Sequence, residues 1–79
     1  MKPDVISIDP EILGGTPVFK GTRVPIQVLF DHLDSGLTTR DFLKSFPTVS
    51  KEQVKQVLDI AETVLLSENI NEWYESASR

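Results

Sequence analysis

The chain has 79 residues, a formal net charge of −4 and no cysteine. A chain of this length has room for one domain and buries only about 60% of its unfolded surface, so we expect a small core and oligomerisation. The lack of cysteine excludes disulfides and thiolate metal sites, and no apolar stretch approaches the roughly 20 residues that span a bilayer. We therefore expect a one-domain, soluble, cytoplasmic protein that does not enter a membrane.

The acidic balance argues against a general polyanion binder, but the charges are unevenly distributed along the chain. Residues 38–56 carry four basic and two acidic side chains, a local balance of +2, whereas residues 67–79 carry one basic and three acidic side chains, a balance of −2. The middle of the chain therefore suits phosphate groups, and its end suits a basic protein surface. Taken alone, these charges fit solvated helix faces without a partner equally well.

Residues 14–25 contain three glycines and two prolines, which predict a compact hairpin. Glycine supplies turns with φ > 0, so Gly14-Gly15 and Gly21 are expected to flank a short strand at Pro17–Lys20. Pro25 is then expected in the first turn of a helix, where its missing N–H costs nothing.

An isolated two-stranded hairpin is marginal in water, so the N-terminal segment 1–25 needs a partner surface. We hypothesise that its strands pair across a two-fold axis as a dimerisation arm; the alternative is that the hairpin covers the chain's own helices. The side chains assigned to dimerisation favour β structure, and they are Val5, Ile6, Ile8, Val18, Phe19 and Val24. Arg23 fits either a fork for phosphate or carboxylate, or an ion pair with Asp9 or Asp31.

Three helices are expected over residues 26–66. The first carries a stripe of apolar residues at helical spacing, made of Ile26, Leu29, Phe30 and Leu33. Gly36 ends this helix as a C-terminal cap. The third helix carries a second such stripe, made of Val54, Val57, Leu58, Ala61 and Leu65.

Two capping boxes predict where the second and third helices begin. Thr38 caps the second helix with Asp41 at its N3 position, and Ser50 caps the third with Gln53 at the same position. The second helix is short because Pro47 follows it. A short helix, a tight turn and a longer capped helix predict a helix-turn-helix, which the first helix completes as a three-helix, homeodomain-like core.

In a helix-turn-helix the first turns of the last helix enter the major groove of DNA. The candidate DNA-binding residues are the polar and basic side chains of this region, which are Arg40, Lys44, Lys51, Lys55 and Gln56. Three-helix units are also common as plain packing solutions, and the acidic Glu52 and Asp59 beside the candidates count against DNA binding. A dimer would double the phosphate contacts and favour it.

The C-terminal segment 67–79 has an amphipathic pattern, with Ile70, Trp73, Tyr74 and Ala77 at helical spacing. Either this tail helix folds back on the core, or Trp73 and Tyr74 are anchors for a groove on a partner protein. The second interpretation makes the segment a partner-binding tail that folds on binding.

Catalysis is not expected, because the sequence offers no nucleophile motif and no pair of histidines. The one histidine, His32, falls in the middle of the first helix, where a solvated side chain is expected. No cofactor and no metal site are predicted.

The run from Ile6 to Pro25 has the pattern Ile-x-x-Asp-Pro-x-Ile-x-Gly-Gly-x-Pro-Val-x-x-Gly-Thr-Arg-Val-Pro. It resembles the opening signature of domain of unknown function 433, a small prokaryotic family regarded as VapB-type antitoxins, and the resemblance extends to Leu65. It implies a PIN-like ribonuclease toxin as partner, bound by the C-terminal region. The residues assigned to toxin binding, from charge and not from family motifs, are Glu68, Ile70, Glu72, Trp73, Tyr74, Glu75 and Arg79.

The sequence thus predicts a mainly α-helical fold with a short N-terminal β-hairpin, a helix-turn-helix core and a tail helix. The predicted function is that of a dimeric antitoxin that inhibits its toxin through the tail and represses its own operon through operator DNA. The alternative is a stand-alone dimeric regulator or interaction module without a toxin.

Overall fold

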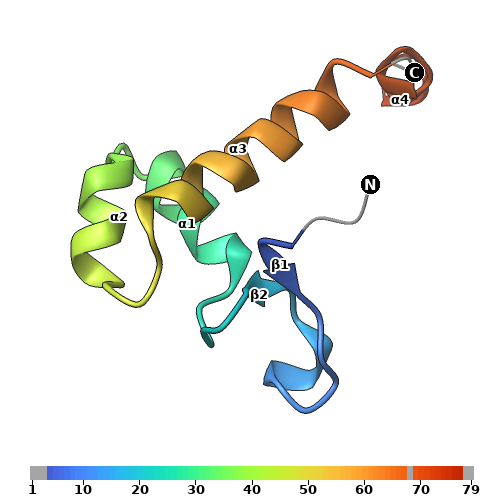
Figure 1. Cartoon of the computed structure of the whole chain (residues 1–79). Helices are drawn as coiled ribbons and strands as arrows, with labels where there is room; N and C mark the ends of the chain where they lie inside the picture. Colours follow the sequence, from blue (N-terminus) through green and yellow to red (C-terminus); the bar gives the residue numbers. More distant parts are fainter. Residues whose placement is uncertain (1–3, 68, 78–79) are drawn as a thin grey trace.

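A computed structural model of the chain describes residues 4–67 and 69–77. Two short strands come first, β1 (Ile6–Ser7) and β2 (Val18–Phe19), with a 3-10 turn at Leu13–Gly15 between them. Four helices follow, α1 (Ile26–Asp34), α2 (Thr39–Ser45), α3 (Lys51–Leu65) and α4 (Asn69–Ala77), as Figure 1 shows. The predicted mainly helical fold with an N-terminal hairpin is confirmed. No helix in the described ranges is both long and apolar enough to cross a membrane.

The hairpin is shorter than its sequence predicts. β1 and β2 are antiparallel, with Ile6 opposite Phe19 and Ser7 opposite Val18. Pro25 forms an additional bridge with Val18 and is the N-terminal cap of α1, so it lies one residue before the first helical turn in which it was expected. This pairing ties the far edge of β2 to the start of α1.

The core joins the hairpin to the helices. It is a cluster of buried side chains, namely Val5, Phe19, Leu29, Phe42, Val49, Val54 and Val57. The rings of Phe19 and Phe42 lie 5.7 Å apart between centroids, which puts β2 directly against α2. The hairpin therefore covers the chain's own helices, as the alternative interpretation expected.

This burial corrects part of the dimerisation set. Val5, Val18 and Phe19 are buried within the chain and offer no side-chain surface to a second copy. Ile6 and Val24 are half-buried against the same core, whereas Ile8 is exposed. The error arises because strand propensity identifies the hairpin but does not say which surface its apolar face covers. Dimerisation itself stays a prediction.

Local hydrogen bonds set the helix boundaries as the sequence predicts. Both capping boxes are present, with the hydroxyls of Thr38 and Ser50 accepting from the N–H groups of Asp41 and Gln53. At the end of α1, Gly36 has φ +84° and the N–H of Leu37 donates to the carbonyl of His32 at 3.0 Å, which is a Schellman arrangement.

The carboxylate of Asp41 makes the stability of the chain depend on pH in the acid range. Its carboxylate accepts from the Thr38 N–H at 2.9 Å and from the Thr38 hydroxyl at 3.0 Å, and these bonds lower the pKa of Asp41 below its ordinary value of 3.8. Because the folded pKa is lower than the unfolded one, the contribution is fully present above pH 3.8 and is lost as pH falls through the folded pKa.

We therefore expect Asp41→Asn to lower the urea midpoint at pH 6 and to flatten its decline between pH 6 and pH 3. Urea titrations followed by circular dichroism at both pH values measure this. The matched control is Asp34→Asn, an exposed carboxylate at the end of α1 for which the structure shows no hydrogen bond within the described residues. If both variants decline alike, Asp41 is not the acid-sensitive group.

Candidate functional site

The five candidate DNA-binding side chains are all exposed on α2 and α3. Arg40 and Lys44 are one helical turn apart on α2, and Lys51 and Lys55 have the same spacing on α3. Lys55 Nζ lies 3.0 Å from Asp59 Oδ2, and both side chains are well exposed, so this ion pair adds little stability. Lys55 can therefore leave Asp59 and pair with another anion, such as a phosphate. The connection 46–50 joins the end of α2 to the start of α3, as Figure 1 shows.

The loop 20–24 between β2 and α1 reaches the first turn of α3, a contact that the sequence did not predict. Gln53 Nε2 donates to the carbonyl of Lys20 at 3.0 Å, while Gln53 Oε1 accepts from the N–H of Ser50 at 3.0 Å. One amide group therefore serves both the capping box and the tie to the loop. Capping-box patterns identify Gln53, but no local signal identifies a partner that is 33 residues away.

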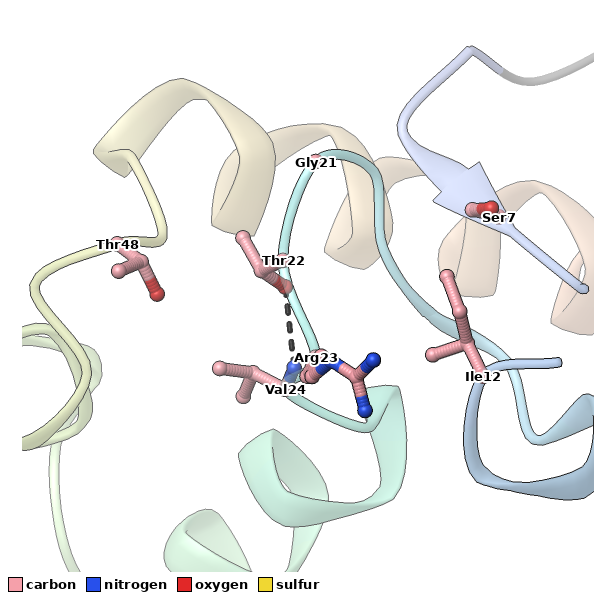
Figure 2. A pocket seen from close by; sticks show the side chains of 7 residues that line it. All are labelled: Ser7, Ile12, Gly21, Thr22, Arg23, Val24 and Thr48. Atoms are coloured by element: carbon pink, nitrogen blue, oxygen red, sulfur yellow. Dashed lines mark hydrogen bonds between the residues drawn. The ribbon is translucent and has the colours of Figure 1, made fainter.

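An open groove of about 590 Å³ lies beside this loop. Figure 2 shows its lining residues, which are Ser7, Ile12, Gly21, Thr22, Arg23, Val24 and Thr48. Within residues 4–67 and 69–77 the salt bridge present is Lys55–Asp59, so Arg23 pairs with neither Asp9 nor Asp31. The ion-pair interpretation of Arg23 is therefore wrong for the described chain, and its exposed guanidinium remains available to a ligand.

A second exposed surface occupies the C-terminal end of the molecule. Val64, Leu65, Leu66 and Tyr74 are exposed to 62%, 58%, 76% and 66%, and we call these four residues the apolar arm. Leu65 was expected on the core stripe of its helix, but α3 extends past the core before it reaches this residue. Figure 1 shows α4 at the far end of α3 from α2.

The predicted tail residues are only partly described. Glu72 and Glu75 are exposed on α4, as is Tyr74. Glu68 and Arg79 lie outside the described residues, and so do the side chains of Ile70 and Trp73. The arm thus has exposed acidic and exposed apolar groups on adjoining segments.

His32 does not have the solvated side chain that the sequence predicts. Its Nδ1 lies 2.9 Å from the carbonyl of Val28, and its ring meets those of Phe42 and Phe46 edge-on at 5.5 and 5.7 Å. The error arises because the nearby Asp31 and Asp34 suggest a solvent-facing segment and are themselves exposed, whereas the histidine turns toward α2. Its role is in packing α1 on α2.

Leu13 has a strained backbone at the tip of the hairpin. Its φ is +49°, in the left-handed region where a residue with a side chain costs about 1–2 kcal/mol, and its side chain is half exposed. Leu13→Gly is therefore expected to raise the free energy of unfolding by up to about 1 kcal/mol, since the strain removed exceeds the burial lost and the added chain entropy.

Urea denaturation measures this gain, and Leu37→Gly is the matched control. Leu37 is exposed to 44%, close to the 50% of Leu13, and it is not among the positive-φ residues of the described chain. The control is expected to be destabilised because glycine adds entropy to the unfolded chain without relieving strain. Equal destabilisation of both variants would show that Leu13 is not strained.

The features above define a mainly helical domain closed by a short N-terminal antiparallel hairpin. The chain belongs to the family described as Protein of unknown function (DUF433), whose model matches residues 6–61. It is also similar to Uncharacterized protein y4eO of Sinorhizobium fredii (strain NBRC 101917 / NGR234), with 32% identity over 59 residues. That alignment covers 75% of this chain and 27% of the relative, so the chain spans about a quarter of the relative's length. No solved structure matches the chain significantly.

The family match extends from β1 into α3 and ends before the apolar arm begins. The loop 20–24, both capping boxes and the basic side chains of α2 and α3 lie within the matched region. The apolar arm and α4 lie beyond it, so the C-terminal surface is a feature of this chain that the family model does not include.

Proposed function

We propose that this chain is the antitoxin of a type II toxin-antitoxin pair. The apolar arm, together with the rest of α4, binds and inhibits a PIN-like ribonuclease toxin. The α2–α3 unit binds the operator DNA of its own operon as a helix-turn-helix. The observation that carries the proposal is the apolar arm, because four large apolar side chains are exposed at one end of a small chain. Contiguous exposed apolar surface marks interaction sites on soluble proteins.

The kind of partner follows from the chemistry of the arm. An amphipathic helix with apolar anchors suits a hydrophobic groove on another protein. Glu72 and Glu75 beside Tyr74 favour a partner with a basic rim. A ribonuclease needs such a rim to bind the RNA backbone. The acidic side chains of α4 therefore imitate RNA phosphates on the rim, and the bound chain inhibits the toxin by blocking access of RNA to it.

DNA binding is the second part of the proposal and is supported by the basic side chains of α2 and α3. Lys51 lies in the first turn of α3, the part of a recognition helix that faces the major groove. The net charge of −4 makes the affinity of a single chain for phosphate low, so a dimer that presents two copies of the surface is expected.

The alternative function is a stand-alone regulator that uses the same α2–α3 surface and has no toxin. Exposure of the apolar arm argues against it, because a tail that completes the fold would bury these side chains against the helices. Tyr74 is exposed to 66%, whereas in a tail packed on the helices it would be buried.

Purification of the chain from its native cells in mild salt tests the proposal. We expect a stoichiometric companion whose ribonuclease activity appears only after the antitoxin is stripped away. Mass spectrometry identifies the companion, and cleavage of a synthetic RNA measures the activity. Elution of the chain alone as a dimer would favour the stand-alone regulator, and a companion without ribonuclease activity would contradict the antitoxin assignment.

A further inference from the structure

We infer that the loop 20–24, which connects β2 to α1, is a second DNA-contacting element, in which the Arg23 guanidinium binds a backbone phosphate next to the site occupied by α3. This inference rests on the proposed DNA binding and deepens it, because the helix-turn-helix prediction places all contacts on α2 and α3. The loop directly follows β2 and lies within the N-terminal segment 1–25, which the sequence assigned to dimerisation.

Loop 20–24 lies beside the N-terminal end of α3. The 3.0 Å bond from Gln53 Nε2 to the Lys20 carbonyl holds the loop against the first turn of α3. Lys51 begins the same turn, two residues before Gln53 and on another face of the helix, so the loop flanks the N-terminal end of α3 that the proposal places on DNA. Thr22 of the loop and Thr48 of the connection before α3 line one groove, as Figure 2 shows.

Hydrogen bonds within the loop hold it in a defined conformation. The Thr22 hydroxyl donates to the Phe19 carbonyl at 2.8 Å and accepts from the Val24 N–H at 3.1 Å. The Phe19 N–H donates to the Val24 carbonyl at 3.0 Å, and the turn is completed at Gly21 with φ +80°. A side chain on a preorganised loop loses little further freedom when it binds, which favours a defined contact.

The side chain of Arg23 suits a phosphate group. Its side chain is exposed, and it forms no salt bridge with any described residue. A guanidinium presents a planar fork of donors that matches two phosphate oxygens, whereas a neutral ligand would not require it. The groove beside it also carries the hydroxyls of Ser7 and Thr48, which are groups that commonly contact phosphate and sugar, whereas the Thr22 proton is already donated to the Phe19 carbonyl.

Salt-dependent DNA binding by Arg23→Gln tests the inference. Affinity for DNA falls as salt rises, and each phosphate contact makes the slope of log affinity against log salt steeper by about 0.9. We therefore expect the slope of Arg23→Gln to be shallower than that of the wild-type chain by about this amount per bound chain. Near 0.1 M salt the affinity falls about tenfold, to a similar extent for the chain's own promoter and for unrelated DNA. Fluorescence anisotropy with labelled duplexes of equal length between 50 and 200 mM salt measures both quantities.

Two further variants separate the fork from general charge. Asn71→Asp lowers the net charge by the same single unit on the exposed surface of α4 and is expected to leave the slope unchanged. Arg23→Lys keeps the charge but not the fork, so it is expected to keep the slope and to recover part of the affinity. Equal melting temperatures of all three variants show that folding is not the cause.

The outcomes distinguish this inference from the function on which it rests. Wild-type binding of promoter DNA with equal slopes for Arg23→Gln and Asn71→Asp overturns the loop contact and leaves α3 as the DNA-binding element. No binding of either duplex by the wild-type chain overturns both. The same titrations are repeated with 10 mM inorganic phosphate. If phosphate abolishes the difference in DNA affinity between the wild-type chain and Arg23→Gln without displacing the DNA, the groove binds a free anion and the DNA contact is overturned.

Discussion

Phe42→Ala is expected to lower the free energy of unfolding by about 3–5 kcal/mol. Phe42 is fully buried, and its ring lies 5.7 Å from Phe19, 5.5 Å from His32 and 5.1 Å from Phe46. It therefore contacts the hairpin, α1 and the connection before α3 at once. Since small domains have only about 5–15 kcal/mol of stability in total, loss of this ring should leave a substantial fraction of the chain unfolded at 25 °C.

Urea denaturation followed at 222 nm measures the loss. Leu37→Ala is the control, because Leu37 lies just before α2, is exposed to 44%, and should cost less than about 1 kcal/mol. Phe42→Leu keeps most of the buried volume and should fall between the two. An unchanged urea midpoint for Phe42→Ala would show that the aromatic cluster does not hold hairpin and helices together.

The sequence predicts the helix boundaries well because they are decided by neighbouring residues. Thr38 with Asp41 and Ser50 with Gln53 form their capping bonds within one helical turn, so the pattern alone is sufficient. Gly36 ends α1 for the same reason, since only its own φ and the adjacent carbonyls are involved.

The long-range contacts could not be predicted in this way. Phe19 favours a strand wherever it is placed, and its burial against Phe42 depends on how the hairpin folds onto α2. The bond from Gln53 to Lys20 likewise joins segments 33 residues apart. Leu65 fits an apolar stripe by spacing, yet it is exposed because the core ends before the helix does.

The candidate site was predicted as residue types and not as an arrangement. Charge and spacing identify Lys51 and Lys55 as exposed, but they do not identify the pairing of Lys55 with Asp59 or the position of Arg23 beside the groove. The kind of partner proposed for the tail is inferred from the exposed apolar arm. The spacing of apolar residues in the sequence fits an exposed helix and a helix packed on the core equally well.

Leu65→Gln combined with Leu66→Gln is expected to weaken binding of the proposed toxin by about 100-fold or more, because truncating central apolar anchors typically costs at least about 2–3 kcal/mol each in hot spots. The two side chains are exposed to 58% and 76% in the chain by itself. Glutamine keeps the helix propensity of leucine, so the stability of the chain should change by less than about 0.5 kcal/mol.

Isothermal titration with the co-purified ribonuclease measures the affinity, and inhibition of RNA cleavage gives an independent readout. The matched control is Ile8→Gln with Leu13→Gln, which removes two large apolar side chains exposed to 66% and 50% on the hairpin. This control should bind the ribonuclease normally, because the hairpin lies outside the arm. Equal loss in both variants would point to general hydrophobic adhesion, and no loss in either would assign toxin binding to a different surface. A loss confined to the Leu65 and Leu66 variant, with its melting temperature unchanged, is the result that the exposed end of α3 requires if it is the toxin-binding surface.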